Sequence, residues 1–242
     1  MRMKRYGTWY GGFWYPDTLP GLNKDSVIYC VGAGEDITHD ICLAKQLGSK
    51  VYIFDPTPRA IDHVRLVKDV LKGDIVPQNS SRYGGGDPNY WNIILSNKIN
   101  PENIVFCDHA LNISPGRHRF FKPNNENFVS HSLVEGMKGD NYIMVEAKTL
   151  KQIMEDFGHD KIDLLKIDIE GSELDVIEYM IKEKIFPQYL SVDFDSFRDK
   201  KDEETQGRCV SILKKLSSEG YRTIHEENKD YTFQRILSSP NG

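Results

Sequence analysis

Two acidic side chains, Asp168 and Glu170, stand one residue apart at the end of an apolar run and directly before a glycine. Acids that end a buried strand are costly to keep unless they gain a partner or a ligand. Because alternate residues of a strand share one side, we expect both carboxyl groups to emerge together. This pair therefore predicts a functional site, in preference to simple pairing with Lys166 or helix capping.

A second acidic pair, Asp193 and Asp195, alternates at the end of the next apolar run. If the two runs are neighbouring strands, three or four carboxylates meet at one sheet edge, and oxygen ligands of this kind bind Mg²⁺. Asp168, Asp193 and Asp195 are therefore an alternative set of metal ligands. An equally weighted interpretation pairs Asp193 and Asp195 with Arg198 and Lys200.

A glycine turn, Gly32-Ala33-Gly34, lies between the first predicted strand of the sheet and the helix after it. Glycines allow a tight turn and the close approach of a ligand to the backbone. Asp55 ends the following strand, where an acid can accept hydrogen bonds from the two ribose hydroxyls of a nucleoside. Together these features predict a nucleoside-binding site.

The residues after the turn indicate which nucleoside is favoured. A dinucleotide-binding turn has a third glycine, but Ile37 stands at that position. Glu35 and Asp36 also place two negative charges where a diphosphate would lie. S-adenosylmethionine carries an ammonium, a sulfonium and a ribose, so it suits this turn better than a nicotinamide dinucleotide. Capping of the helix by the two acids is an equally weighted alternative.

The elements that position these residues alternate between strands and helices. Apolar runs predict strands near 27–31, 51–54, 104–106, 142–145, 164–169 and 189–194, with a final pair at 221–225 and 231–236. Helices are expected at 37–47, from Thr57 and Pro58 onward, from the Thr149/Gln152 capping box to Gly158, after a Ser172 cap at 173–184, and at 203–218. This order predicts a mostly parallel α/β sheet closed by an antiparallel pair.

Two segments interrupt this pattern. Residues 73–101 are rich in Gly, Asn, Ser and Pro, and we expect a loop insertion there. Residues 1–25 contain a dense group of aromatic side chains between positions 9 and 15, which predicts an extension packed on a domain that spans residues 26–242. Burial of these rings is favoured over a substrate lid.

Composition limits the classes of protein that remain. A chain of 242 residues with 39% hydrophobic residues can bury one sizeable core. The net charge of −5 argues against a nucleic-acid partner. The four cysteines form no C-x-x-C pair, and we find neither a signal peptide nor a run long enough to span a membrane. We therefore expect a soluble protein of a reducing, cytoplasmic compartment. A homodimer is compatible with these properties.

Three motifs resemble the FkbM family of S-adenosylmethionine-dependent methyltransferases: 31–34, 54–60 and 165–173, of which the K-I-D-I-E-G-x-E run at 166–173 is the most specific. The resemblance covers residues 26–236. It implies the Rossmann-like class I methyltransferase fold, with a seven-stranded sheet, an antiparallel last strand and helices on both faces. Two departures are Cys30, where many members carry Asp, and Asp36, where a later glycine is usual.

The resemblance also implies the cofactor contacts. Asp108 is expected to bind the exocyclic amine of adenine beside His109, and residues 127–133 are expected to line the cleft. The full set of expected S-adenosylmethionine contacts is Gly32, Ala33, Gly34, Glu35, Asp36, Asp55, Pro56, Thr57, Asp108, His109, Ala110 and Asp168.

These expectations combine into one functional hypothesis. The chain is expected to be an O-methyltransferase that transfers a methyl group to a hydroxyl of a small polar acceptor, a sugar or glycan on family grounds. Asp168 and Glu170 would serve as catalytic residues, with one acting as general base or hydroxyl orienter. A non-catalytic nucleoside-binding module of the same fold and an NAD-dependent oxidoreductase are the alternatives.

Overall fold

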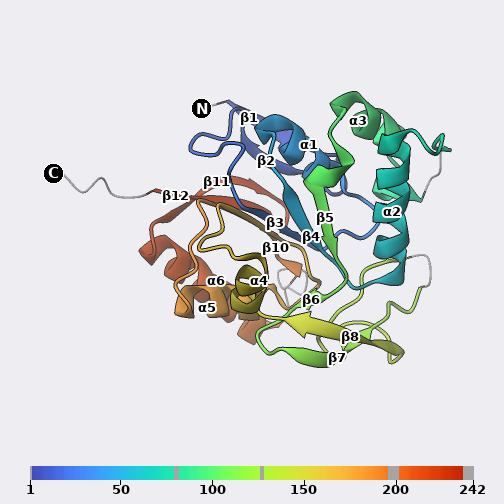
Figure 1. Cartoon of the computed structure of the whole chain (residues 1–242). Helices are drawn as coiled ribbons and strands as arrows, with labels where there is room; N and C mark the ends of the chain where they lie inside the picture. Colours follow the sequence, from blue (N-terminus) through green and yellow to red (C-terminus); the bar gives the residue numbers. More distant parts are fainter. Residues whose placement is uncertain (1, 79–81, 126–127, 196–201, 237–242) are drawn as a thin grey trace.

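The central sheet has seven strands in the order β11-β12-β10-β9-β3-β4-β5 (Figure 1). In the computed structural model, residues 2–78, 82–125, 128–195 and 202–236 are described. The strands are β3 (Ile28–Val31), β4 (Val51–Phe54), β5 (Ile104–Cys107), β9 (Leu164–Ile167), β10 (Tyr189–Asp193), β11 (Tyr221–Glu227) and β12 (Asp230–Arg235). Strand β12 runs antiparallel to both of its neighbours, β10 and β11, and the other neighbouring pairs in this sheet are parallel. The predicted parallel sheet with an antiparallel last strand is confirmed.

Helices cover both faces of this sheet. One face packs against α1 (Thr38–Leu47), α2 (Pro58–Lys72) and α3 (Tyr90–Asn97), and the other against α4 (Leu150–Phe157), α5 (Glu173–Lys182) and α6 (Glu203–Ser218). Each face has its own cluster of buried apolar side chains. Because strands β3 and β9 are buried on both faces, their sequences are apolar almost throughout. Among the described residues, no helix is long and apolar enough to cross a membrane.

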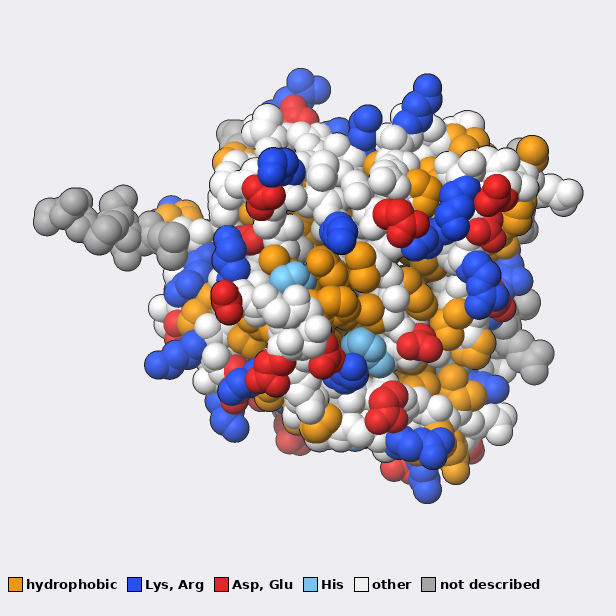
Figure 2. Space-filling view, in the orientation of Figure 1, with side chains coloured by type: hydrophobic (Ala, Val, Ile, Leu, Met, Phe, Trp, Pro, Cys, Tyr) orange, Lys and Arg blue, Asp and Glu red, His pale blue; other side chains and the backbone are white. Residues whose placement is uncertain are grey.

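A smaller sheet lies beyond the carboxyl ends of the parallel strands (Figure 1). Its order is β6-β8-β7, formed by β6 (Ala110–Leu111), β7 (Gly116–Phe121) and β8 (Tyr142–Lys148). The strand predicted near 142–145 therefore belongs to this smaller sheet as β8 and not to the central one. Figure 2 shows hydrophobic side chains gathered near the centre of the same view, with charged side chains around them.

The N-terminal segment forms a hairpin of β1 (Met3–Tyr6) and β2 (Phe13–Pro16). Tyr6, Phe13 and Tyr15 are buried in the same cluster as α1, α2 and α3. Trp9 and Tyr10, in the connecting turn, remain largely exposed. The expected burial therefore applies to the rings of the strands and not to the two rings of the turn.

Three local expectations were wrong. Residues 73–101 are not a plain loop, because they contain α3 and a short 3₁₀ helix, η1 (Tyr83–Gly86). Helix α3 forms because Tyr90, Trp91 and Ile94 bury one face in the core, a pattern that the surrounding Asn and Ser residues obscure. Strand β9 ends at Ile167 rather than at 169. Ser172 stands at the N-cap of α5 but its side chain makes no capping hydrogen bond.

The capping box expected before α4 is confirmed. The Thr149 side chain accepts a hydrogen bond from the Gln152 backbone N–H, and the Gln152 side chain accepts one from the Thr149 N–H, both at 3.2 Å. Gly158 then ends the helix in the left-handed conformation. In this case the sequence signal is local, so no tertiary contact is needed to interpret it.

Candidate active site

A pocket of about 280 Å³ lies at the carboxyl edge of the central sheet. The ends of β3, β4, β9 and β10 form its floor, and β6, the segment 129–133, the β11–β12 turn and the β1–β2 turn form its walls. The carboxyl edge of a parallel sheet is where open α/β proteins bind ligands. One end of this pocket is lined by apolar side chains, namely Val31, Phe54, Ala110, Leu111, Phe120 and Leu133.

The glycine turn packs directly against the end of β9. Gly32 has φ +86°, and a Cβ atom added there would lie 1.9 Å from the Asp168 carbonyl oxygen. A side chain is therefore excluded at Gly32 by both its backbone conformation and its packing. This contact holds the glycine turn beside the segment that carries Asp168 and Glu170.

Asp55 organises the turn from the next strand. One of its carboxylate oxygens accepts the backbone N–H groups of Ala33 and Gly34, both at 2.9 Å. The other accepts the N–H and hydroxyl of Thr57, at 2.8 and 2.7 Å. Asp55 and Pro56 both line the pocket. A ribose would have to share oxygens that already accept four hydrogen bonds, so the ribose contact stays a prediction.

Glu35 and Asp36 line the pocket but are both bound to neighbouring residues. Glu35 pairs with the guanidinium groups of Arg59 and Arg82. Asp36 accepts hydrogen bonds from the hydroxyl of Thr8 and, at 2.9 and 2.7 Å, from the N–H and hydroxyl of Thr38 at the start of α1. Burial raises the pKa of Asp36. The contacts of Asp36 with Thr38 fit the alternative role of helix capping. The negative charge of Glu35 is balanced by the two arginines.

The adenine contacts expected beyond β5 are only partly assembled. Ala110 lines the pocket, but the described pocket-lining residues include neither Asp108 nor His109. Asp108 is exposed. The His109 ring is buried 5.4 Å from the centre of the Phe54 ring, and burial lowers its pKa. The structure therefore brings the apolar part of this segment to the pocket and leaves its polar residues outside.

The two predicted catalytic acids do meet in the pocket, although not through strand alternation. Because β9 ends at Ile167, Asp168 and Glu170 both lie in the following turn, where Glu170 has φ +54°. Asp168 lies 3.1 Å from the Lys166 ammonium, and Glu170 lies 2.8 Å from that of Lys138. Burial, followed by the adjacent Asp195 carboxyl, raises the pKa of Glu170 to about 8.

The second acidic pair has a lysine partner. Lys229 donates to Asp193 at 2.7 Å and to Asp195 at 2.6 Å. Asp193 lines the pocket, while Asp195 is buried beside it. Burial, followed by the charge of Asp168, raises the pKa of Asp193 to about 8. The proposed pairing partners Arg198 and Lys200 lie outside the described residues.

These lysine contacts bear on the Mg²⁺ hypothesis. The carboxylates of Asp168, Asp193 and Asp195 all contact an ammonium group, so a cation already balances each of the three proposed ligands. A metal would have to displace Lys166 and Lys229 from these positions. The Mg²⁺ alternative therefore has no support from the geometry.

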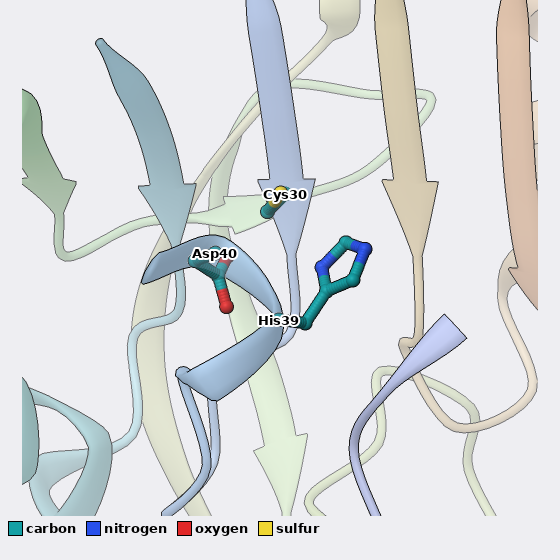
Figure 3. A group of neighbouring side chains, drawn as sticks. All are labelled: Cys30, His39 and Asp40. Atoms are coloured by element: carbon teal, nitrogen blue, oxygen red, sulfur yellow. The ribbon is translucent and has the colours of Figure 1, made fainter. Parts of the chain in front are cut away.

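Three buried polar side chains, Cys30, His39 and Asp40, form a cluster beside β3 and α1 (Figure 3). Cys30 comes from β3, and His39 and Asp40 come from the first turn of α1; their potential ligand atoms lie within 4.8 Å of one another. Burial raises the pKa of Cys30, lowers that of His39 and raises that of Asp40 to about 6. The buried ammonium of Lys166, opposite Cys30 in the sheet, already supplies a positive charge near this cluster. The raised pKa of the Cys30 thiol and the nearby ammonium of Lys166 both oppose metal binding. We therefore interpret the cluster as a structural support for the glycine turn.

Some pocket residues were not identified as site residues from the sequence, among them Lys229, Asp230 and Tyr10. Lys229 lies in the β11–β12 turn, and Asp230 begins β12, where antiparallel pairing places it opposite Asp193. Beside Asn228, Lys229 and Asp230 resemble the charged residues of an ordinary exposed hairpin turn. The sequence therefore does not indicate that they line the pocket. Tyr10 was considered only as part of an aromatic segment. Of the segment expected to line the cleft, 127–133, the part from Val129 to Leu133 lines the pocket. Residue 127 lies outside the described residues.

A family model and solved structures are similar to this chain. The family model for the methyltransferase FkbM domain matches residues 31–223. The solved fibrillarin/Nop5p complex has a chain that is 12% identical, with a TM-score of 0.43 and coverage of 89% of this chain and 75% of that one. A Methanococcus jannaschii fibrillarin, a pre-rRNA processing protein, is 15% identical, with a TM-score of 0.39 and coverage of 87% and 66%. The comparison with curated proteins gave no match. Because the family match spans most of the length and includes the glycine turn and both acidic strand ends, this chain belongs to the FkbM methyltransferase family.

Proposed function

We propose that the protein is an S-adenosylmethionine-dependent O-methyltransferase that acts on a hydroxyl group of a sugar or glycan. The observation that carries the proposal is that one pocket holds both the glycine turn with Asp55 and the acids Asp168 and Glu170. The family implies the methyl donor, and the acids supply groups suited to a hydroxyl acceptor.

The pocket residues fit S-adenosylmethionine in their chemistry. Apolar side chains around Ala110 and Leu111 suit a nucleobase, whereas the turn from Gly32 to Glu35 and the Asp55 carboxylate suit polar groups. Gly34 has φ +50°, and among the described residues only Val129, at 3.3 Å, lies within 4 Å of an added Cβ, so few side chains cover the backbone there. We propose that these residues hold the nucleoside and the amino-acid portion of the donor.

When bound, S-adenosylmethionine supplies a methyl group on a sulfonium, which is already a good leaving group. The protein must then align the acceptor oxygen and remove its proton, and alignment alone lowers barriers by up to ~7–11 kcal/mol in favourable cases. We propose that Asp168 orients the acceptor hydroxyl and that Glu170 takes its proton. A carboxyl with a pKa near 8 is a stronger base than an ordinary glutamate, which favours this assignment.

The test is methyl transfer by the purified full-length protein. We expect S-adenosylhomocysteine to form in the presence of a panel of sugars and glycans, and product analysis to locate the new methyl group on oxygen. Methylation of nitrogen, sulfur or carboxyl groups instead would contradict the O-methyltransferase assignment. Binding of S-adenosylmethionine without turnover of any acceptor would favour the nucleoside-binding alternative.

A further inference from the structure

Tyr10 reaches the pocket from the turn of the N-terminal hairpin, outside the sheet that supplies the other site residues. The centre of its ring lies 6.0 Å from that of Trp9 in an edge-to-face arrangement. Burial, followed by the charges of Asp168 and Glu170, raises the pKa of Tyr10. The phenol therefore lies close enough to the two proposed catalytic acids to be influenced by their charges.

The position of Tyr10 is built by a set of contacts. The buried hydroxyl of Thr8 donates to Asp36 and accepts the N–H groups of Tyr10 and Gly11 at 3.3 and 3.1 Å. The Tyr10 ring also packs against Gly85, where an added Cβ would lie 2.5 Å from the ring. The turn is thus held in place, and Tyr10 forms a fixed wall rather than a loosely attached side chain.

The pocket that Tyr10 lines also contains several acidic side chains. Asp168, Glu170, Asp193 and Asp230 line it, and burial, followed by the charge of Asp168, raises the pKa of Asp230 to about 6. The two lysines among the described pocket-lining residues, Lys166 and Lys229, both contact carboxylates. A phosphate placed here would meet acids and would compete with them for these ammonium groups.

We infer that the acceptor is a neutral or cationic, ring-shaped polyol that stacks on Tyr10, and that sugars carrying a phosphate or diphosphate are excluded from this end of the pocket. The inference rests on the proposed function and names the acceptor class of the same site. An aromatic ring in the same pocket as several carboxyl groups provides an apolar surface for the ring face and hydrogen-bond partners for its hydroxyls.

The first experiment compares matched acceptors with the full-length protein. For each hexose in the panel, kcat/KM is measured for the neutral glycoside, the amino sugar and the sugar phosphate. We expect the phosphate to be at least about tenfold poorer, with the difference shrinking as ionic strength rises. Equal or preferential use of the phosphate overturns the inference and leaves the proposed function intact. No turnover with any member of the panel overturns both.

The second experiment tests the aromatic wall. Tyr10→Ala is expected to raise the KM for the neutral acceptor by about 3- to 10-fold, while Tyr10→Phe retains the stacking surface and the KM. Trp9→Ala is the matched control, because Trp9 belongs to the same turn, is 62% exposed and does not line the pocket. The affinity for S-adenosylhomocysteine should be unchanged in all three variants. An unchanged acceptor KM in Tyr10→Ala, or an equal rise in Trp9→Ala, contradicts the role of Tyr10.

Discussion

Glu170 combines a strained backbone with an unusual acidity. A left-handed conformation costs a non-glycine residue about 1–2 kcal/mol, and at Glu170 it directs the turn that follows β9. The hydroxyl of Ser132 donates to the Glu170 carbonyl oxygen at 2.6 Å, which ties this turn to the cleft segment. Such strain is often found at functional sites, in agreement with a proposed catalytic role for this residue.

The pKa of Glu170 predicts the pH dependence of the reaction. A general base works only when deprotonated, so kcat/KM should rise with pH and level off above about 8, falling about tenfold per unit below that value. Glu170→Gln should lower kcat by ~10²-fold or more and remove this limb. Asp193 has a similarly raised pKa, so Asp193→Asn is the comparison and should retain the limb. If Asp193→Asn alone removed the rise of kcat/KM with pH, the general base would be Asp193 rather than Glu170.

Among single residues, the sequence was most informative for site residues that directly follow a predicted strand. Asp168 and Glu170 were identified from their place after an apolar run, and both line the pocket. Asp108 follows its strand in the same way, yet the chain leaves β5 toward β6 and Asp108 stays exposed. Lys229 reaches the site only through the pairing of β12 with β10, and nothing near it in the sequence indicates that pairing.

Among the elements, the contact between the glycine turn and β9 is the tightest near the site. Gly32→Ala should destabilise the protein by well over ~2 kcal/mol, because it adds a backbone clash to the cost of a positive φ. Gly73→Ala is a matched control: its φ is +85°, but nothing lies within 4 Å of the added Cβ, so about 1–2 kcal/mol is expected. Denaturant unfolding measures both values. Equal losses would mean that the contact with Asp168 contributes little.

The β11–β12 turn is fastened to β10 by Lys229. Lys229→Met leaves Asp193 and Asp195 without this cation, and we expect a loss of about 2–3 kcal/mol at pH 8. Lys229 lowers the pKa of Asp193, so removing this cation raises the folded-state pKa of Asp193 further, and Asp193 takes up a proton as the pH falls. The difference from the wild type should therefore narrow toward pH 5. A constant difference across this range in urea unfolding would contradict the electrostatic explanation.

Whether an element could be predicted depended on how local its signal is. The capping box of Thr149 and Gln152 lies within one turn of α4 and was identified correctly. Helix α3 was missed because its stability comes from burial of Tyr90, Trp91 and Ile94 in a core that is built mainly by distant segments. Strand β9 was predicted too long, because the alternating apolar run continues to Ile169 although the strand pairing ends at Ile167.

Across the whole molecule, the site is assembled from segments far apart in the chain. The β1–β2 turn supplies Tyr10, the central strands supply the turn and the acids, and the β11–β12 turn supplies Lys229. The mostly parallel order of the sheet was predictable, because alternating strand and helix patterns leave few topologies. The contribution of the two terminal hairpins was not, since it depends on tertiary packing.

The central claim is that this pocket binds the donor of a methyl group. Calorimetric titration of the full-length protein with S-adenosylhomocysteine tests it most directly, with NAD as the comparison ligand. We expect S-adenosylhomocysteine to bind at one site per chain, with affinity reduced by Gly32→Ala, and NAD to give no binding heat. Absence of S-adenosylhomocysteine binding, or binding of NAD in its place, would contradict the account.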